Sequence, residues 1–167
     1  MKINVGCCDL PLPKPWINVD NMVNQHARPD IVLDGRELDN HFPLNSVEEI
    51  YAGHFLEHLT PTEAENWFSM CYRLLEGDGK LCVTVPDFRF IVKGYLEGDP
   101  GFAVKDLLET YIFSYRQESL HRSLWDVDSV VDIFGRHGFH DIREMDRMED
   151  PRVAYGVPWQ LVVEGVK

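Results

Sequence analysis

The sequence predicts an α/β fold, a three-layer sandwich built on a mostly parallel sheet. Short segments dense in Ile, Val and Leu alternate along the chain with segments of helical periodicity, and Gly, Asp or Pro follows each apolar segment. The apolar segments are hydrophobic almost without interruption, which is typical of strands covered on both faces. Alternation of such strands with helices favours the layered α/β architecture.

The expected parallel strands lie in the first half of the chain. They span residues 3–5, 16–19, 31–33, 49–52 and 81–85. Two later segments, residues 141–145 and 159–166, are expected to be strands that pair in antiparallel fashion at the edge of the sheet. The sheet is therefore expected to be mostly parallel with an antiparallel edge strand.

The clearest helix is expected from Pro61 to about Leu75. Thr60 suits the N-cap, Pro61 suits the first helical position, and Glu63 completes a capping box. Gly77 is placed to end the helix. Apolar residues recur at helical spacing on one face only, so this helix should cover a sheet.

A second helix is expected to begin after Asp126 and to end near Gly138. Its expected buried residues are Val127, Val130, Val131 and Phe134. Two weaker helical stretches, residues 88–98 and 102–117, are separated by a turn rich in glycine. Aromatic residues crowd this region, which favours packing against the core over a substrate cover.

Length and composition indicate one domain over residues 1–167. A net charge of −12 disfavours nucleic acid and anionic membranes as partners. No apolar run approaches the ~18 residues of a membrane span, and the N-terminus lacks the regions of a signal peptide. The four cysteines lack the paired spacing of a zinc site or disulfide framework. We therefore expect a cytoplasmic protein.

Candidate ligand-binding residues directly follow the strands, because ligands bind beyond the carboxyl ends of an open parallel sheet. These positions are Gly6 to Asp9, Asp20, Asp34, Gly35, Gly53, His54, Pro86 and Asp87. An acidic residue such as Asp20 can accept hydrogen bonds from both hydroxyls of a ribose. Three prolines between Gly6 and Asp20 preclude the usual first helix, whose N-terminus normally holds a pyrophosphate. The pattern favours a cofactor with a ribose and no phosphate.

Six short motifs follow one another along the chain, and their order is more specific than any one of them: INVGC, WINVD, DIVLDGREL, EEIYAGHFLEHL, LLEGDGKLCVTVPD and HRSLWDVDSVVDIFGRHGF. This order resembles the class I S-adenosylmethionine-dependent methyltransferases, specifically small bacterial and phage-type members. The resemblance covers roughly residues 2 to 146. It implies a Rossmann-like sheet, S-adenosylmethionine as cofactor, and a helical substrate cover over residues 88–121.

The resemblance also implies roles for the residues at the strand ends. Gly6 and Cys7 would lie against the methionine part of the cofactor, and Asp20 would hold the ribose hydroxyls. Asp34 and Gly35 would border the adenine. Gly53 and His54 would lie near the reactive methyl group. Two positions depart from the family pattern, since Cys8 stands where many members have glycine and Asn4 where an acidic residue is common.

His54 and His121 are the candidate catalytic residues. The resemblance places His54 near the methyl group, and His121 suits a general base because the ordinary pKa of histidine lies near neutrality. The alternative for His121 is a surface position beside Arg122. His54 and His58 have the spacing of a helical metal pair, but no third ligand is evident, so we expect no metal.

The expected methyl acceptor is a small molecule, such as a sugar, a metabolite or a carrier-bound group. The chain lacks the Asn/Asp-Pro-Pro-aromatic signature of enzymes that methylate amino groups of nucleic acids, and its net charge is negative. The main alternative is a non-catalytic domain of the same fold that serves in binding or assembly, and a binder of another nucleoside is a third. The sequence leaves a homodimer open.

Overall fold

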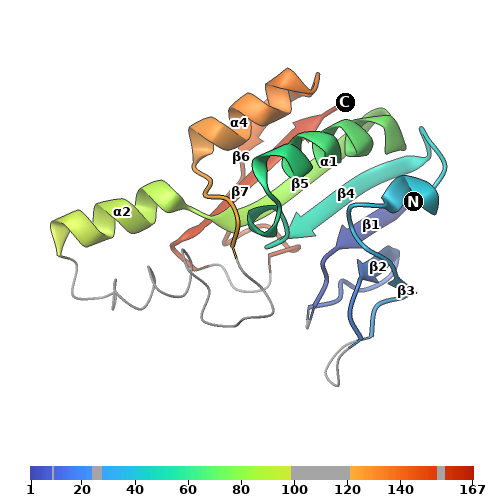
Figure 1. Cartoon of the computed structure of the whole chain (residues 1–167), viewed down its shortest axis with the longest axis horizontal. Helices are drawn as coiled ribbons and strands as arrows, with labels where there is room; N and C mark the ends of the chain where they lie inside the picture. The colour runs from blue at the N-terminus through green and yellow to red at the C-terminus, as the bar shows by residue number, and fades with distance from the viewer. Residues whose placement is uncertain (9, 24–27, 99–120, 154–156) are drawn as a thin grey trace.

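The structure is a computed structural model that describes residues 1–8, 10–23, 28–98, 121–153 and 157–167. Its centre is a seven-stranded sheet with the strand order β3-β2-β1-β4-β5-β7-β6, which confirms the predicted α/β fold (Figure 1). The parallel strands are β1 (Lys2–Val5), β2 (Trp16–Asp20), β3 (Ile31–Val32), β4 (Val47–Gly53) and β5 (Leu75–Pro86). β7 (Gln160–Val166) runs antiparallel to both β5 and the edge strand β6 (His140–Glu144).

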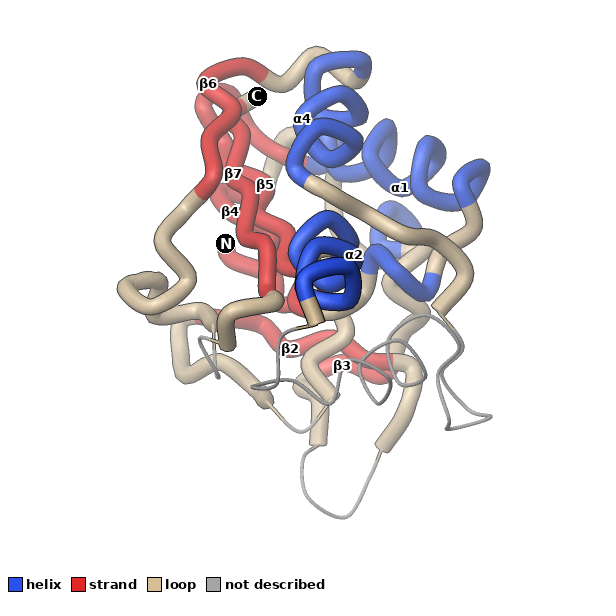
Figure 2. The backbone as a smooth tube through the Cα atoms, turned by 90° about the vertical axis from the view of Figure 1, so that its left-hand side faces the viewer, coloured by secondary structure: helices blue, strands red, loops and turns tan. Residues whose placement is uncertain are grey.

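Helices cover one face of this sheet. α1 (Pro61–Leu74) packs against β5, and α4 (Val127–Arg136) packs against β6 and β7 on the same side (Figure 2). α2 (Phe88–Glu97) follows β5 and extends beyond its end. The expected helix over residues 102–117 lies outside the described residues. No helix in the described parts of the chain has the length and apolar character needed to cross a membrane.

The bounds of α1 agree with the prediction to within one residue, but Gly77 does not end the helix. The Thr60 side chain accepts a hydrogen bond from the Glu63 N–H, and the Glu63 carboxylate accepts one from the Thr60 N–H. The helix ends at Leu74, and the extended, buried Leu75 already begins β5 by pairing with Val47. Gly77 is therefore a strand residue, because burial of Leu75 in the sheet decides where the helix stops.

The buried face of α4 agrees with the prediction at Val130 and Phe134, whereas Val127 is only partly buried and Val131 is not buried. Asp126 caps the helix as expected, and Gly138 follows it with a φ of +89°. Val130, Ile133 and Phe134 are buried, but Val131 is exposed. Residues three and four apart share a helix face, so burial of Val130 directs the neighbouring Val131 toward solvent.

Loops, rather than helices, cover the opposite face of the sheet in the described part of the chain (Figure 2). The chain between β1 and β2 contains no helix in its described residues, 6–8 and 10–15, in line with the proline-rich sequence there. A small second core on this face contains Tyr51, Cys82 and Val162, with Leu12, Trp16, Met145 and Val153 packed against it.

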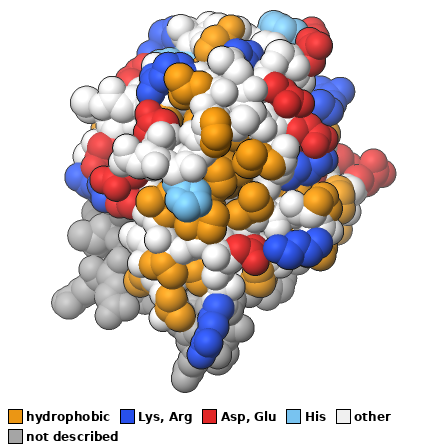
Figure 3. All heavy atoms as spheres, turned by 90° about the vertical axis from the view of Figure 1, so that its right-hand side faces the viewer, with side chains coloured by type: hydrophobic (Ala, Val, Ile, Leu, Met, Phe, Trp, Pro, Cys, Tyr) orange, Lys and Arg blue, Asp and Glu red, His pale blue; other side chains and the backbone are white. Residues whose placement is uncertain are grey.

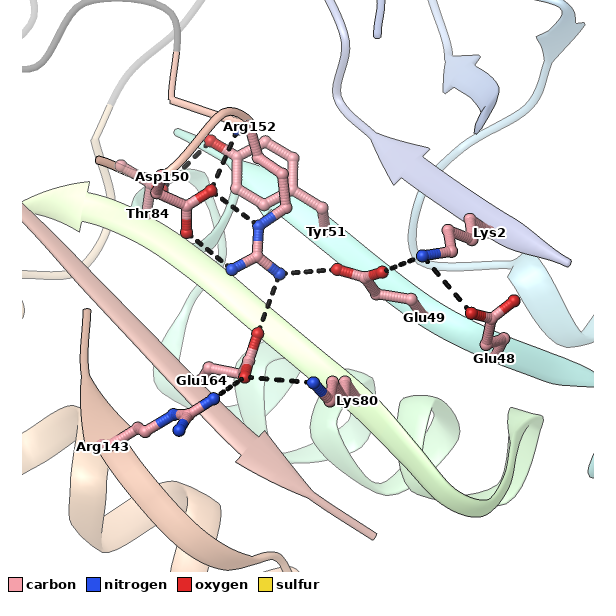
Figure 4. Close-up of polar contacts among 10 residues, drawn as sticks. All are labelled: Lys2, Glu48, Glu49, Tyr51, Lys80, Thr84, Arg143, Asp150, Arg152 and Glu164. Carbon is pink, nitrogen blue, oxygen red and sulfur yellow. Dashed lines mark hydrogen bonds and ion pairs between the residues drawn. The ribbon is translucent and has the colours of Figure 1, made fainter. Parts of the chain in front are cut away.

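Arg152 organises a network of charges on this loop-covered face (Figure 4). Its guanidinium donates to Glu49 (2.6 Å), Asp150 (2.6 Å) and Glu164 (2.9 Å), and its side chain is only 9% exposed. Burial opposes the ionisation of Arg152, but its hydrogen bond to Asp150 and the charges of Asp150 and Glu49 help to raise its pKa overall. Lys2, Lys80 and Arg143 pair with the outer sides of these carboxylates. The network joins β4, β7 and the loop between β6 and β7.

Candidate functional site

The carboxyl ends of β1, β2 and β3 open into one cavity of about 360 Å³. Gly6 follows β1, Asp20 ends β2, and Asp34 with Gly35 follows β3, so parallel pairing brings these predicted residues to one edge of the sheet. All four line this cavity, as does His54 after β4. The remaining wall is formed by Cys8, Asn21, Met22, Arg36, Phe55, His58, Leu59 and Arg122.

Both carboxylate oxygens of Asp20 hold the surrounding turns in place. Oδ2 accepts a hydrogen bond from the Cys8 N–H at 2.8 Å, and Oδ1 accepts one from the Met22 N–H at 2.9 Å. Each carboxylate oxygen has two lone pairs, so both can accept a further hydrogen bond. Asp20 can therefore hold a diol while it fixes the loop after β1.

The turn after β1 explains why glycine is favoured there. Gly6 has a φ of +67° and donates its N–H to the Val19 carbonyl at 2.9 Å, while Cys8 has a φ of +41°. A left-handed backbone suits glycine, yet Cys8 adopts it with its N–H bound to Asp20. Burial and the Asp20 carboxylate raise the pKa of the Cys7 thiol to about 11, so Cys7 is a packing residue rather than a nucleophile at neutral pH.

Asp34 and Gly35 form a rigid part of the cavity wall. The Asp34 carboxylate accepts hydrogen bonds from Arg36 Nε at 3.0 Å and Nη2 at 2.6 Å, and these bonds lower the pKa of Asp34 despite its burial. The Gly35 carbonyl accepts a hydrogen bond from Trp67 Nε1 at 3.0 Å. The wall at this end is therefore tied to α1, which carries Trp67.

A second cavity of about 580 Å³ adjoins the first and contains the other predicted cofactor residues, Cys7 and Gly53. The two cavities share Gly6, Cys8, His54 and His58. The wall of the second cavity is completed by Asn4, Leu10, Tyr51, Arg152, Val157, Trp159 and Gln160. A ligand in the first cavity and another in the second would meet near His54.

His54 is held on both sides of its ring. Its Nε2 lies 2.7 Å from the Gln160 amide nitrogen, and its Nδ1 lies 2.9 Å from Glu57 Oε1. The Gln160 amide oxygen accepts from the Val157 N–H, which fixes the amide so that its nitrogen faces His54. This hydrogen-bond network assigns the proton to Nδ1, which donates to Glu57, and leaves Nε2 as the acceptor.

Glu57 and Gln160 are the main site residues that sequence reasoning missed. Glu57 is almost completely buried, and although burial raises its pKa, the His54 hydrogen bond and the nearby His58 lower it overall. Its spacing of three residues from His54 in HFLEH was an available signal. Gln160 comes from β7, and no local pattern links it to His54.

The other predicted positions lie at the edge of this site. His121 packs edge to face on His58, with ring centroids 4.9 Å apart, and lines a narrow pocket beside Glu57. Its predicted catalytic role stays a prediction. Asp87 accepts a hydrogen bond from the Phe90 N–H at 3.1 Å and so serves as the N-cap of α2.

No protein-family model matches the chain, and no curated protein matches its sequence. Solved structures do match. An S-adenosylmethionine-dependent methyltransferase from Archaeoglobus fulgidus has a TM-score of 0.66 at 16% identity, with 99% of this chain and 85% of that chain covered. The chain has the class I methyltransferase fold.

Further methyltransferase structures agree with this fold. One from Thermotoga maritima, described as a possible histamine N-methyltransferase, has a TM-score of 0.62 at 14% identity and covers 99% of this chain and 81% of its own. The 1,6-didemethyltoxoflavin-N1-methyltransferase of Burkholderia thailandensis, with bound S-adenosylhomocysteine, has a TM-score of 0.58 at 13% identity. This match covers 99% of the present chain and 70% of the Burkholderia chain. The seven-stranded sheet of this chain thus matches the fold of these methyltransferases.

Proposed function

We propose that the chain is an S-adenosylmethionine-dependent methyltransferase that acts on a small-molecule acceptor. The observation that carries the proposal is the convergence of Gly6, Asp20, Asp34 and Gly35, from three neighbouring strand ends, on one cavity. Its volume of about 360 Å³ lies within the ~300–1,000 Å³ typical of small-molecule sites. The fold and the cavity therefore support the same function.

Each predicted cofactor residue has a proposed task in this cavity. Asp20 accepts hydrogen bonds from the ribose hydroxyls, Asp34 and Gly35 border the adenine, and Gly6 lies against the methionine part, with Cys7 and Gly53 in the adjoining cavity. S-adenosylmethionine, when bound, supplies an activated methyl group, so the chain has mainly to align the acceptor with it.

The second cavity is the proposed acceptor site. Tyr51, Trp159 and Leu10 give it an apolar and aromatic wall, which is typical of small-molecule sites. His54 lies between the two cavities, and its Nε2 lone pair accepts from the Gln160 amide, so an acceptor hydroxyl or ammonium group that displaces this amide can give its proton to Nε2. Glu57 positions His54 by accepting the hydrogen bond from Nδ1.

Surface charge supports a small acceptor over a nucleic acid. The net charge is −12. On the face shown in Figure 3, Lys and Arg side chains are mostly interspersed with Asp and Glu instead of forming a broad basic patch. A nucleic-acid substrate would require such a patch to contact phosphates.

Calorimetric titration with S-adenosylhomocysteine tests the cofactor site. We expect wild-type protein to bind, and Asp20→Ala to weaken binding by about 1–3 kcal/mol, because a charged hydrogen-bond acceptor is lost. Asp132→Ala, on an exposed part of α4, is the control and should bind as wild type does. Equal affinities for the Asp20 and Asp132 variants would remove Asp20 from the site.

Activity requires a separate measurement with labelled S-adenosylmethionine and sets of small hydroxyl and amine acceptors. Transfer of label to one acceptor, lost in His54→Gln while S-adenosylhomocysteine still binds, would support the proposed enzyme. Cofactor binding without transfer to any acceptor would instead favour a non-catalytic binding module.

A further inference from the structure

We propose that Glu57, His58 and His121 bind a divalent transition-metal ion, for which Zn²⁺ is the best-suited candidate. The inference goes beyond the proposed methyltransferase function, since no step of that function requires a metal. It also departs from the expectation of a metal-free protein, because the third ligand comes from a segment distant in sequence from HFLEH.

The three side chains bring one oxygen and two nitrogens together. One ligand atom from each of Glu57, His58 and His121 lies within 4.8 Å of the other two. A tetrahedral Zn²⁺ holds such ligands roughly 3.4 Å apart, as bond lengths near ~2.0–2.1 Å require. Binding of an ion would therefore draw the three ligand atoms closer together than they lie in this structure.

Glu57 provides an independent reason to expect a cation. The residue is only 1% exposed, its Oε1 accepts a hydrogen bond from His54, and its Oε2 has no hydrogen-bond partner among the described residues. A buried carboxylate oxygen is costly unless a donor or a metal satisfies it. A metal ion bound with His58 and His121 would satisfy Oε2 while His54 keeps Oε1.

The backbone fixes His121 beside the other two ligands. The N–H groups of Arg122 and Ser123 donate to the Glu57 carbonyl at 2.7 and 3.2 Å, and Ser123 Oγ donates to the Leu56 carbonyl at 3.3 Å. The Arg122 guanidinium pairs with Glu63 at 2.9 Å, so its positive charge is neutralised by that carboxylate. The ligand set is therefore assembled by the fold before any ion binds.

The donor types indicate which metals fit. Two imidazole nitrogens and one carboxylate are a common set for zinc sites that keep one position open, whereas Mg²⁺ and Ca²⁺ prefer oxygen ligands. His58 also lines both large cavities, so a bound ion would lie at their wall. A ligand from the acceptor cavity can supply the fourth donor.

Zinc titration of the full chain tests the site directly. The protein, purified without an affinity tag and stripped with a chelator, is titrated calorimetrically with Zn²⁺, and bound metal is counted by elemental analysis. We expect one strongly bound ion per chain, and at least tenfold weaker binding in both His58→Gln and His121→Gln. His140→Gln removes an exposed imidazole on β6, away from both cavities, and should bind as wild type does.

A second readout keeps the proposal testable if a variant fails to fold, which circular dichroism would reveal. Co²⁺ in place of Zn²⁺ should give wild-type protein the visible absorption of a tetrahedral site with nitrogen and oxygen ligands. Absence of that absorption, absence of Zn²⁺ binding, or unchanged Zn²⁺ affinity in both histidine variants would overturn the proposal.

Titration with S-adenosylhomocysteine in the same samples separates the two proposals. Loss of Zn²⁺ binding in His121→Gln with cofactor binding retained would support the metal site as a distinct feature. Cofactor binding by a wild-type protein that takes up no Zn²⁺ would overturn the metal site alone, whereas Zn²⁺ binding without cofactor binding would count against the proposed function only.

Discussion

Gly6 and Gly35 at the candidate site are favoured as glycine for two different physical reasons. Gly6 has a positive φ, which glycine adopts without strain. At Gly35 the reason is space, because an added Cβ would lie 2.5 Å from Val5 Cγ1 and 2.8 Å from the Phe55 ring. The sequence motifs contain both glycines, but only the structure shows that one is needed for its backbone conformation and the other for lack of space.

Gly35→Ala is expected to destabilise the protein by about 1–3 kcal/mol, the usual cost of forcing a methyl group into a packed site. The free energy of unfolding from urea titration measures this. Gly77→Ala is the control, since an added Cβ there meets no atom within 4 Å. Equal stability of the two variants would show that Val5 and Phe55 can move aside.

At the scale of elements, the N-terminus of α1 both starts a helix and supports the cavity wall. Glu63 completes the capping box with Thr60, and its carboxylate also pairs with Arg36 and Arg122, each at 2.9 Å. Both arginines line the first cavity. Hydrogen bonds from Thr60, together with the two arginines, lower the pKa of Glu63 from an ordinary 4.5 to about 2.

This pKa predicts an acid-sensitive contribution to stability. Because the folded-state pKa of Glu63 lies below its unfolded value, the contribution is complete above about pH 4.5 and is lost as the pH falls toward 2. Glu63→Gln keeps an acceptor for the Thr60 N–H but loses the charge that pairs with Arg36 and Arg122, so it should lower the free energy of unfolding at pH 7 by about 0.5–1 kcal/mol. It should also show a smaller decline between pH 4.5 and 2.

Urea titrations over that pH range provide the measurement. Glu76→Gln, which removes a carboxylate at an exposed position on β5, is the matched charge control. A Glu63→Gln profile parallel to that of wild type at every pH would contradict the assigned role of the Glu63 charge.

At the scale of the whole molecule, Arg152 closes the face of the sheet that loops cover in the described residues. Its contacts with Glu49 on β4 and Glu164 on β7 join distant parts of the chain across β5 (Figure 4). Burial raises the pKa of Asp150 and Glu164, but bonds to arginine lower both overall, so these acids are held ionised in the fold. The loop layer is thus attached to the sheet by charge as well as by its small apolar core.

Arg152→Ala should destabilise the protein by about 3–5 kcal/mol, because it leaves buried carboxylates without their shared partner. Thermal and urea unfolding measure the loss, and Arg152→Lys, which keeps a charge, should lose less. The comparison is Arg73→Ala, whose pair with Asp39 is largely exposed and should cost about 0–1 kcal/mol. Similar losses for Arg152→Ala and Arg73→Ala would show that the network does not stabilise this face.

The sequence by itself determined the local features of the molecule. The approximate positions of the strands and of α1, α2 and α4, the N-caps of α1 and α4, and the residues at the strand ends follow from patterns a few residues long, and the described part of the chain confirms them. Residues such as Asp20 and Asp34 were predicted to share a site because parallel strands end at one edge, and both line one cavity.

Tertiary structure alone decided the features that depend on distant segments. The contact of Gln160 with His54, the approach of His121 to His58, and the pairing of Arg152 with Glu49 each join residues far apart in sequence. Strand order and burial create these contacts, and neither is encoded in a short pattern. For the same reason Leu75 began a strand where local signals extended the helix.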